Sequence, residues 1–223
     1  MELSKEKWSE SLKKIKPEVK RMWYKGNIEL LLDSAPKLAI VGSRRMSDYG
    51  AEVIKKWMSV LVSKEMTIVS GFMYGVDQAA HRACMESGGK TIAVLGWGID
   101  KEPVPEDEKL YRRILGNGGL IVSEYEGEQE GTRWTFPERN RIVAGISDAV
   151  LVVEAAEKSG SLITARLARK FGKRLLAVPG EVTSKVAEGT NGLIRRGMAV
   201  MVSSAEEVLG EMGLNGGQMK MGF

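Results

Sequence analysis

The chain of 223 residues contains a single cysteine, Cys84, and a single histidine, His81. One cysteine excludes an internal disulfide, and one histidine excludes zinc clusters and metal sites built on two histidines. No apolar run reaches membrane-spanning length, and the N-terminus is charged from Glu2 onward, unlike a signal peptide. We therefore expect a cytoplasmic protein with no metal, no cofactor and no membrane partner.

The residues that are present make up an ordinary globular composition, 43% hydrophobic and 28% charged. At this length, one domain with one sizeable core is the simplest expectation. The formal net charge is only +4, but basic residues occur in pairs, such as Arg44-Arg45, Arg112-Arg113 and Arg195-Arg196. Such pairs are compatible with a polyanionic partner and also with a solvated surface.

From residue 37 to about residue 210, short apolar segments alternate with longer segments of helical periodicity. This rhythm predicts an α/β fold, with a doubly wound, mostly parallel sheet. Ligands of such sheets bind beyond the carboxyl ends of the strands, so function is expected there. The strands are expected at residues 38–41, 67–69, 91–95, 120–122, 149–153 and 175–178.

The two ends of the chain are predicted to differ from this regular part. Residues 1–36 are expected to form a lead-in that packs on the core, with a short helix in 4–14 and a short strand before the Gly26-Asn27 turn. A possible edge strand at 199–202 and a helix from Ser204 follow the core. Residues 211–223 are glycine-rich and are expected to form a flexible tail.

The stretch 38–47 predicts a buried strand that ends at Gly42 and leads into a helix. The first-turn N–H groups of a helix carry partial positive charge, so an anion can sit there. Gly42 permits close approach, Ser43 and Ser47 offer hydroxyls, and Arg44 offers a planar fork suited to phosphate. A plain strand-to-helix turn with surface arginines explains this segment equally well.

A second loop of this kind opens the helix that follows the strand at 149–153. Lys158, Ser159, Gly160, Ser161 and Thr164 offer backbone N–H groups, hydroxyls and one ammonium group to an anion. The alternative is an ordinary helix cap. Two such loops at one sheet edge, with a basic segment between them in sequence, favour a polyphosphate backbone over a single phosphate.

Two pairs of residues invite an enzymatic interpretation. Glu124 and Glu154 end neighbouring elements, and could act as acid and base in cleaving a nucleotide's glycosidic bond. Acids at strand ends also simply orient loops. Asp77 and His81 can meet on one helix face, but there is no Gly-x-Ser-x-Gly turn, so a hydrogen-bonded structural histidine is expected.

Read together, these segments resemble the DprA/Smf family of bacterial DNA-processing proteins from Trp23 to about Leu209. The resemblance rests on many motifs in a fixed order. They are Ala39-Ile40-Val41-Gly42-Ser43-Arg44, Ser70-Gly71, Gly75-Val76-Asp77, Ala80-His81, Thr91-Ile92-Ala93-Val94-Leu95-Gly96, Phe136-Pro137-Glu138-Arg139-Asn140-Arg141, Val153-Glu154-Ala155, Ser159-Gly160-Ser161-Leu162-Ile163-Thr164-Ala165, Ala177-Val178-Pro179-Gly180 and Gly189-Thr190-Asn191.

The resemblance implies an extended Rossmann-like domain that binds single-stranded DNA, forms a homodimer and loads a RecA-type recombinase during natural transformation, without catalysis. It places the family's basic position on Arg133 and its base-contacting aromatic residue on Phe136, where a ring can stack on any base. The expected DNA-binding residues are Gly42, Ser43, Arg44, Ser47, Ser70, Gly71, Arg133, Phe136, Arg139, Asn140, Arg141, Lys158, Ser159, Gly160, Ser161 and Thr164.

Two other function classes stay open at this point. One is a nucleotide-binding enzyme of the phosphoribohydrolase class, although the chain has Val178-Pro179-Gly180-Glu181 where such enzymes carry a Pro-Gly-Gly-x-Gly-Thr loop. The other is a sensor of small nucleotides that uses the loop 159–164. Full-length relatives often add a domain at each end, so we expect this chain to correspond to the core alone.

Overall fold

The six strands predicted for the core all form in the computed structural model, which describes residues 1–214. Each lies within one or two residues of its predicted bounds, so the predicted fold class is confirmed. The strands are β2 (Lys37–Val41), β3 (Thr67–Ser70), β4 (Lys90–Leu95), β5 (Leu120–Ser123), β6 (Ala149–Val152) and β7 (Arg174–Ala177). Two further strands, β1 (Trp23–Gly26) and β8 (Val200–Met201), occupy the edges of the sheet.

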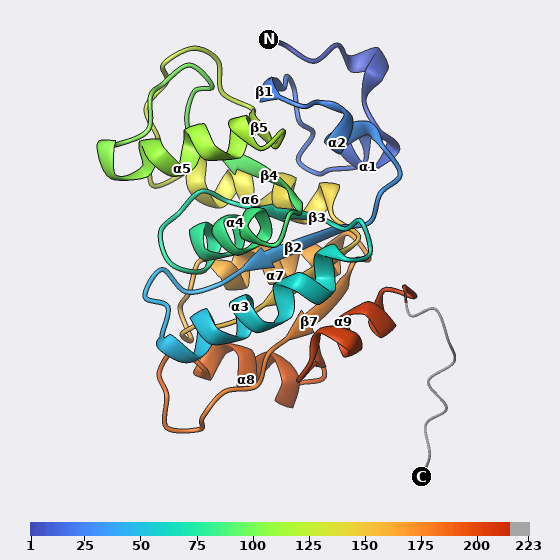
Figure 1. The fold of residues 1–223 in the computed structure, drawn as a ribbon, viewed down its shortest axis with the longest axis vertical. Helices are drawn as coiled ribbons and strands as arrows, with labels where there is room; N and C mark the ends of the chain where they lie inside the picture. The colour runs from blue at the N-terminus through green and yellow to red at the C-terminus, as the bar shows by residue number, and fades with distance from the viewer. Residues whose placement is uncertain (215–223) are drawn as a thin grey trace.

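The eight strands form one sheet in the order β1-β5-β4-β3-β2-β6-β7-β8 (Figure 1). All neighbouring strands are parallel except β1, which is antiparallel to β5. The chain winds outward from β2 toward β5, then returns to the other side of β2 with β6. Beside this reversal, loops at the carboxyl ends of β2 and β6 diverge and leave a crevice, as in doubly wound sheets generally.

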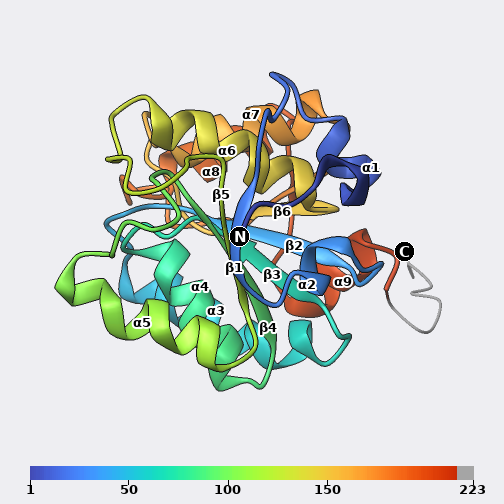
Figure 2. The ribbon, with the colours of Figure 1, turned by 90° about the horizontal axis from the view of Figure 1, so that it is seen from above.

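Helices cover both faces of the sheet, and β2 is therefore buried on both sides. Leu38 and Ile40 belong to one apolar cluster, whereas Ala39 and Val41 belong to the other, following the two-residue period of a strand. Figure 2 shows the two helical layers on either side of the sheet. One contains α3 (Asp48–Val62), α4 (Val76–Glu86), α5 (Pro105–Gly116) and α9 (Ala205–Glu211), and the other contains α1 (Glu10–Lys13), α6 (Thr135–Ile146), α7 (Ser161–Lys170) and α8 (Glu188–Arg195).

The N-terminal segment forms two short helical pieces instead of the single helix predicted within residues 4–14. A 3₁₀ turn at Lys5–Lys7 is separated from α1 by Trp8, whose backbone is extended and whose side chain is buried. Ser9 then starts α1, because its hydroxyl accepts a hydrogen bond from the N–H of Leu12. The chain continues through α2 (Glu29–Leu32) into β2. This segment is integrated into the core, since β1 extends the sheet.

The C-terminal part follows the predicted order, with β8 at the sheet edge and α9 after Ser204. The hydroxyl of Ser204 accepts a hydrogen bond from the N–H of Glu207 and so caps α9. Most of the tail predicted at residues 211–223 lies outside the described residues. Within residues 1–214, no helix combines the length and apolar character required to cross a membrane.

Candidate functional site

A cavity of about 650 Å³ lies at the point where the strand order reverses. It is enclosed by the loops that follow β2 and β3, the first turns of α6 and α7, and the loop that follows β7. Its charged lining consists of five basic side chains and one acid. These are Arg44, Arg45, Arg139, Lys158 and Lys185, together with Asp77.

The loop after β2 is shaped by the turn that precedes α4. Gly75 has a φ of +84°, and a Cβ built on it would lie 2.3 Å from the carbonyl oxygen of Ser43. Only glycine fits this close approach. The Ser43 hydroxyl accepts a hydrogen bond from the N–H of Arg45 at 3.0 Å, which folds the loop back on itself. Arg44 is thereby presented to solvent at the mouth of the cavity.

Arg44 lies between two aromatic rings. Its guanidinium carbon is 5.9 Å from the ring centre of Tyr74 and 6.0 Å from that of Phe136, at the outer limit for cation–π contact. The structure resolves no salt bridge for this side chain within the described residues. Arg44 therefore keeps its fork of N–H donors available for a ligand.

The N-terminus of α3 already holds an anion from the protein itself. The N–H of Ser47 donates to the Glu154 carboxylate at 2.9 Å, and the Ser47 hydroxyl donates to the other oxygen in a short hydrogen bond. Glu154 is only 3% exposed, and a Cβ built on Gly50 would lie 2.6 Å from its Oε2. The predicted anion position at this helix is therefore filled by Glu154, and Ser47 does not line the cavity.

The N-terminus of α7, by contrast, faces the cavity. Ser159, Gly160, Ser161 and Thr164 all contribute to the cavity wall beside Lys158. Within the described residues, α7 has neither a side-chain cap nor an acidic residue in its first turn. Its partial positive charge is thus offered to a ligand.

Two groups of opposite charge, Asp77 and Arg139, lie beside the loop after β3. Arg139 is 2% exposed, and it donates a short hydrogen bond to the carbonyl oxygen of Val94 and another to the Asn140 side chain. A Cβ built on Gly71 would lie 2.3 Å from an Asp77 oxygen and 2.7 Å from an Arg139 nitrogen, so these two groups flank Gly71. Arg139 supplies buried positive charge beneath the cavity.

Burial governs the protonation of both members of this pair. It raises the pKa of Asp77 from 3.8 to about 6, although the nearby Arg139 charge acts in the opposite direction. Burial also lowers the pKa of Arg139 to about 10, which leaves the guanidinium charged at neutral pH. Asp77 is consequently the acidic group of the cavity that changes charge near physiological pH.

His81 has the structural role expected of it. Its Nδ1 lies 2.7 Å from the Thr91 hydroxyl, and its Nε2 lies 2.6 Å from the Gly71 carbonyl oxygen. Burial lowers the pKa of the imidazole to about 4, so the ring is neutral at pH 7. The histidine fixes the backbone at Gly71 and contacts no cavity space.

Arg141, which was expected to bind DNA, is instead committed to the protein interior. It is 3% exposed, and its Nη2 lies 2.6 Å from both oxygens of Glu124. Its Nε donates to the Pro17 carbonyl oxygen, so the ion pair fastens the N-terminal segment to α6. Ser70 is similarly used, because its hydroxyl donates to the Ile40 carbonyl oxygen at 2.6 Å.

The remaining predicted residues either line the cavity or, in the case of Arg133, lie outside it. Arg133 is exposed just before α6 and lies over the ring of Trp134 at 4.7 Å, outside the cavity. Twelve of the sixteen predicted residues do meet at the cavity, although they come from four separate segments. They are Gly42, Ser43, Arg44, Gly71, Phe136, Arg139, Asn140, Lys158, Ser159, Gly160, Ser161 and Thr164.

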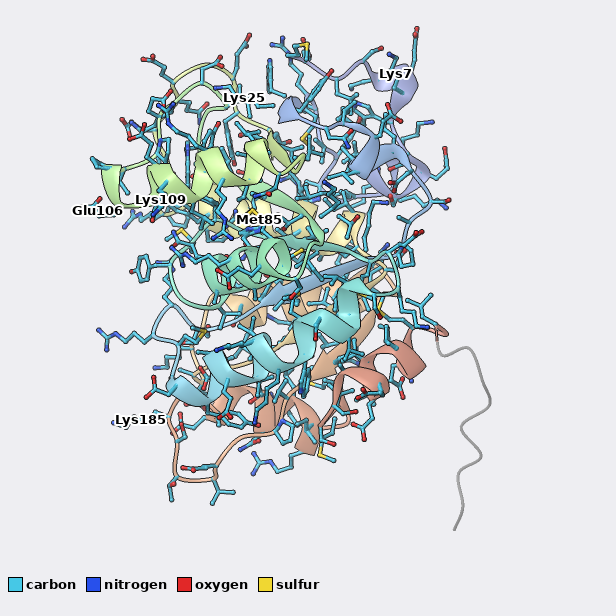
Figure 3. All side chains as sticks on the ribbon, viewed as in Figure 1. Lys7, Lys25, Met85, Glu106, Lys109 and Lys185 are labelled. Carbon is cyan, nitrogen blue, oxygen red and sulfur yellow. The ribbon has the colours of Figure 1, made fainter. Side chains whose placement is uncertain are left out.

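Two cavity residues were missed from the sequence. Tyr74 is 56% exposed beside Arg44, and its only sequence signal was its place near the Gly75-Val76-Asp77 motif. Lys185 lies on the long loop after β7, as Figure 3 shows, and no local pattern marks it. Both lie at the cavity because the loops after β3 and β7 bring them there.

A smaller, mostly apolar hollow of about 300 Å³ adjoins the cavity. Phe72, Trp97 and Val104 contribute to it, while Tyr74 and Phe136 line both spaces. The rings of Trp97 and Phe136 meet edge to face, 6.2 Å apart. Phe136 therefore stands between a basic space and an aromatic one, an arrangement suited to a ligand with both phosphates and flat rings.

The two carboxylates considered for acid–base catalysis do not share this space. Glu124 is held by Arg141 and Glu154 by Ser47, and neither lines the cavity. Within residues 1–214, no group of three or more histidine, cysteine, aspartate or glutamate residues is arranged to hold a metal ion. The groups that line the cavity are mainly side chains and backbone N–H groups that can bind an anion.

Comparison with known proteins finds similar sequences that match most of this chain. Residues 1–213 match the sequence profile of the family described as DNA recombination-mediator protein A. The chain is 42% identical to DNA processing protein DprA of Streptococcus pneumoniae over 190 residues, which cover 85% of this chain and 66% of that protein. It is 41% identical to Protein Smf of Synechocystis and covers 44% of it. The chain therefore spans about half to two thirds of these curated relatives.

Two solved structures share the fold closely. The X-ray structure of the Streptococcus pneumoniae protein superposes with a TM-score of 0.87 at 38% identity, covering 95% of this chain and 74% of that one. DNA processing protein A from Helicobacter pylori, whose structure is described as revealing a single-stranded DNA binding mode, gives a TM-score of 0.85 at 30% identity. That alignment covers 94% of each chain.

Replacing Glu154 with glutamine should destabilise the protein. The carboxylate loses its charge at the α3 N-terminus, and charge-assisted hydrogen bonds of this kind contribute roughly 1.5–3 kcal/mol. The free energy of unfolding, measured with urea, should fall by about that amount. Glu52→Gln on the same helix is the control: it removes only a solvent-exposed ion pair with Lys56 and should lower the free energy of unfolding by less than about 1 kcal/mol. Equal midpoints for Glu154→Gln and the wild type would contradict this role.

Proposed function

Because this chain belongs to the DNA recombination-mediator protein A family, we propose that it binds single-stranded DNA in the cavity beside β2 and β6. The phosphates contact Arg44 and the N-terminus of α7, and one base stacks on Phe136. Binding of this kind reads the backbone and the flat faces of bases, so it has little sequence preference. Its role is DNA processing without bond cleavage.

One observation carries this proposal, namely that Arg44, Phe136 and the open end of α7 line the same space. Guanidinium groups and helix N-termini both suit phosphate, and an aromatic ring beside them suits a base. The Helicobacter pylori relative, described as binding single-stranded DNA, supports the same assignment. The cluster of basic side chains around the cavity adds attraction that does not depend on sequence.

A small nucleotide is the second candidate ligand, since a cavity of about 650 Å³ falls within the usual size range of small-molecule sites. An oligonucleotide that binds no more tightly than a mononucleotide would favour this alternative. Homodimer formation, delivery of DNA to a RecA-type recombinase, a part in natural transformation and cytoplasmic location stay predictions of the resemblance.

Arg44→Gln and Phe136→Ala should weaken binding in different ways. Loss of one phosphate contact should make the slope of log K against log salt shallower by about 0.7 on single strands. Loss of base stacking should cost roughly 1–3 kcal/mol with the slope unchanged. Fluorescence anisotropy with oligothymidine at several salt concentrations measures both effects.

Arg112→Gln is the matched control for this experiment. Arg112 lies on α5, away from the cavity, and is paired with Glu108. Its loss should leave affinity unchanged. Absence of oligothymidine binding at low salt, or equal affinities for the Arg44 and Arg112 variants, would contradict the proposed function.

Binding should strengthen as pH falls from 7.5 to 5.5. With a pKa of about 6, Asp77 is ionised at the upper pH and repels phosphate, but becomes largely neutral at the lower pH. A bound phosphate that raises this pKa by about half a unit gives a roughly threefold gain in affinity. His81, with a pKa near 4, stays neutral throughout the range.

The test compares the pH profile of the wild type with that of Asp77→Asn, using oligothymidine because thymine does not titrate in this range. The variant should bind with an affinity that is independent of pH. Thermal unfolding confirms that it is folded at each pH. A wild-type profile that is flat, or that has the opposite slope, would refute the role of Asp77.

A further inference from the structure

A second hollow, of about 540 Å³, lies at the opposite end of α7 from the cavity. It forms where the end of α1 meets the turn that follows α7. Four lysines and one partly exposed aromatic ring contribute to its lining. These residues are Lys14, Lys16, Lys170, Lys173 and Phe171.

The four lysines form no salt bridge within the described residues, although the charge of Asp148 acts on Lys173. No carboxylate among residues 1–214 lines the hollow. Basic side chains elsewhere on the surface are often paired, as Arg174 is with Glu211 and Lys56 with Glu52. An anion bound here would therefore meet ammonium groups that are not already held in a salt bridge.

Lys14 and Lys173 are also close enough to repel one another. Burial lowers the pKa of Lys173, the charge of Asp148 acts in the opposite direction, and the charge of Lys14 contributes a smaller lowering. Asp148 accepts a hydrogen bond from the N–H of Lys37, which holds it at the start of β2. A bound polyanion would relieve the repulsion between the lysines.

One helix connects this hollow with the cavity. The first turn of α7 lines the cavity, and Lys170 in its last turn lines the hollow. With ten residues and a rise of 1.5 Å per residue, α7 is about 15 Å long. Arg166 and Arg169 are exposed between the two ends, at spacings that place them on the same side of α7 as Lys170, and Lys173 follows the end of the helix. Figure 2 shows α7 on the outside of its layer, in the same layer as α1.

We propose that the lysine hollow holds the continuation of the DNA strand bound in the cavity, so that one single strand follows α7 from its first turn to its last. This inference rests on the proposed function and extends it by a second contact region. The lysines and arginines contact successive phosphates, and the ring of Phe171 offers a stacking surface. Bases are free to stack in this way on a single strand but are hidden in a duplex.

The test uses two lengths of oligothymidine, about 5 and about 20 nucleotides, so that only the longer strand can reach both regions. The double variant Lys16→Gln/Lys170→Gln should bind the longer strand several-fold more weakly. Its salt slope should be shallower by about 1.4, at about 0.7 for each of two lost phosphate contacts. The shorter strand should bind as it does to the wild type.

Lys55→Gln/Lys64→Gln is the matched control, because it removes the same charge from exposed positions on and just after α3. It should leave both affinities unchanged. Equal effects of the two double variants, equal weakening for both lengths, or equal weakening for a duplex of the longer strand would overturn the inference.

Arg44→Gln separates failure of this inference from failure of the proposed function. The variant should weaken binding of both lengths, since both strands occupy the cavity. If Arg44→Gln weakens binding but the lysine variant does not, the path along α7 is wrong and the cavity assignment stands. If Arg44→Gln has no effect on either length, the proposed function and the path that starts from it both fail.

Discussion

The Ser47 backbone and hydroxyl hold the carboxylate of Glu154 against the first turn of α3. This contact joins the loop after β2 to the end of β6, which are the two sides of the point where the strand order reverses. It also neutralises the N-terminus of α3 with a charge from within the protein. Of the helices that follow β2 and β6, α3 thus has its N-terminus occupied by Glu154, whereas that of α7 is left to attract a ligand.

The rest of the site follows from that division. With α3 fixed by Glu154, the loop at Ser43 and Arg44 rests on Gly75 and turns Arg44 outward, between Tyr74 and Phe136. Arg139 lies beneath the loop after β3, where it supplies charge that solvent does not screen. The cavity thus combines the exposed Arg44, the buried Arg139 and the N-terminus of α7, on a frame held by hydrogen bonds.

The sequence was sufficient for the sheet but only for part of the site. Buried parallel strands such as β2 and β6 are continuous apolar runs with polar residues after them, so their positions could be read directly. Which partner a polar side chain finds depends on segments distant in sequence. Arg141 meets Glu124 and Pro17, and Ser47 meets Glu154, so the structure gives these predicted anion-binding residues partners within the protein.

The same limitation explains the residues that were missed. Lys185 carries no local signal and Tyr74 only a weak one, its place beside the Gly75-Val76-Asp77 motif, because their position at the cavity depends on the course of the loops after β3 and β7. The order of motifs along the chain nonetheless identified the family correctly, since order is preserved even where individual roles are not visible. Local sequence patterns predict helices and strands well. Hydrogen bonds and ion pairs between distant segments decide which polar side chains stay available to a ligand.

A crystal structure of the protein with a short oligothymidine tests this account most directly. The account predicts a phosphate within hydrogen-bond distance of both the Arg44 guanidinium and the N–H groups at Gly160 and Ser161, with Glu154 still bound to Ser47. A phosphate seated at the N-terminus of α3 in place of the Glu154 carboxylate, or a strand bound away from this cavity, would contradict it.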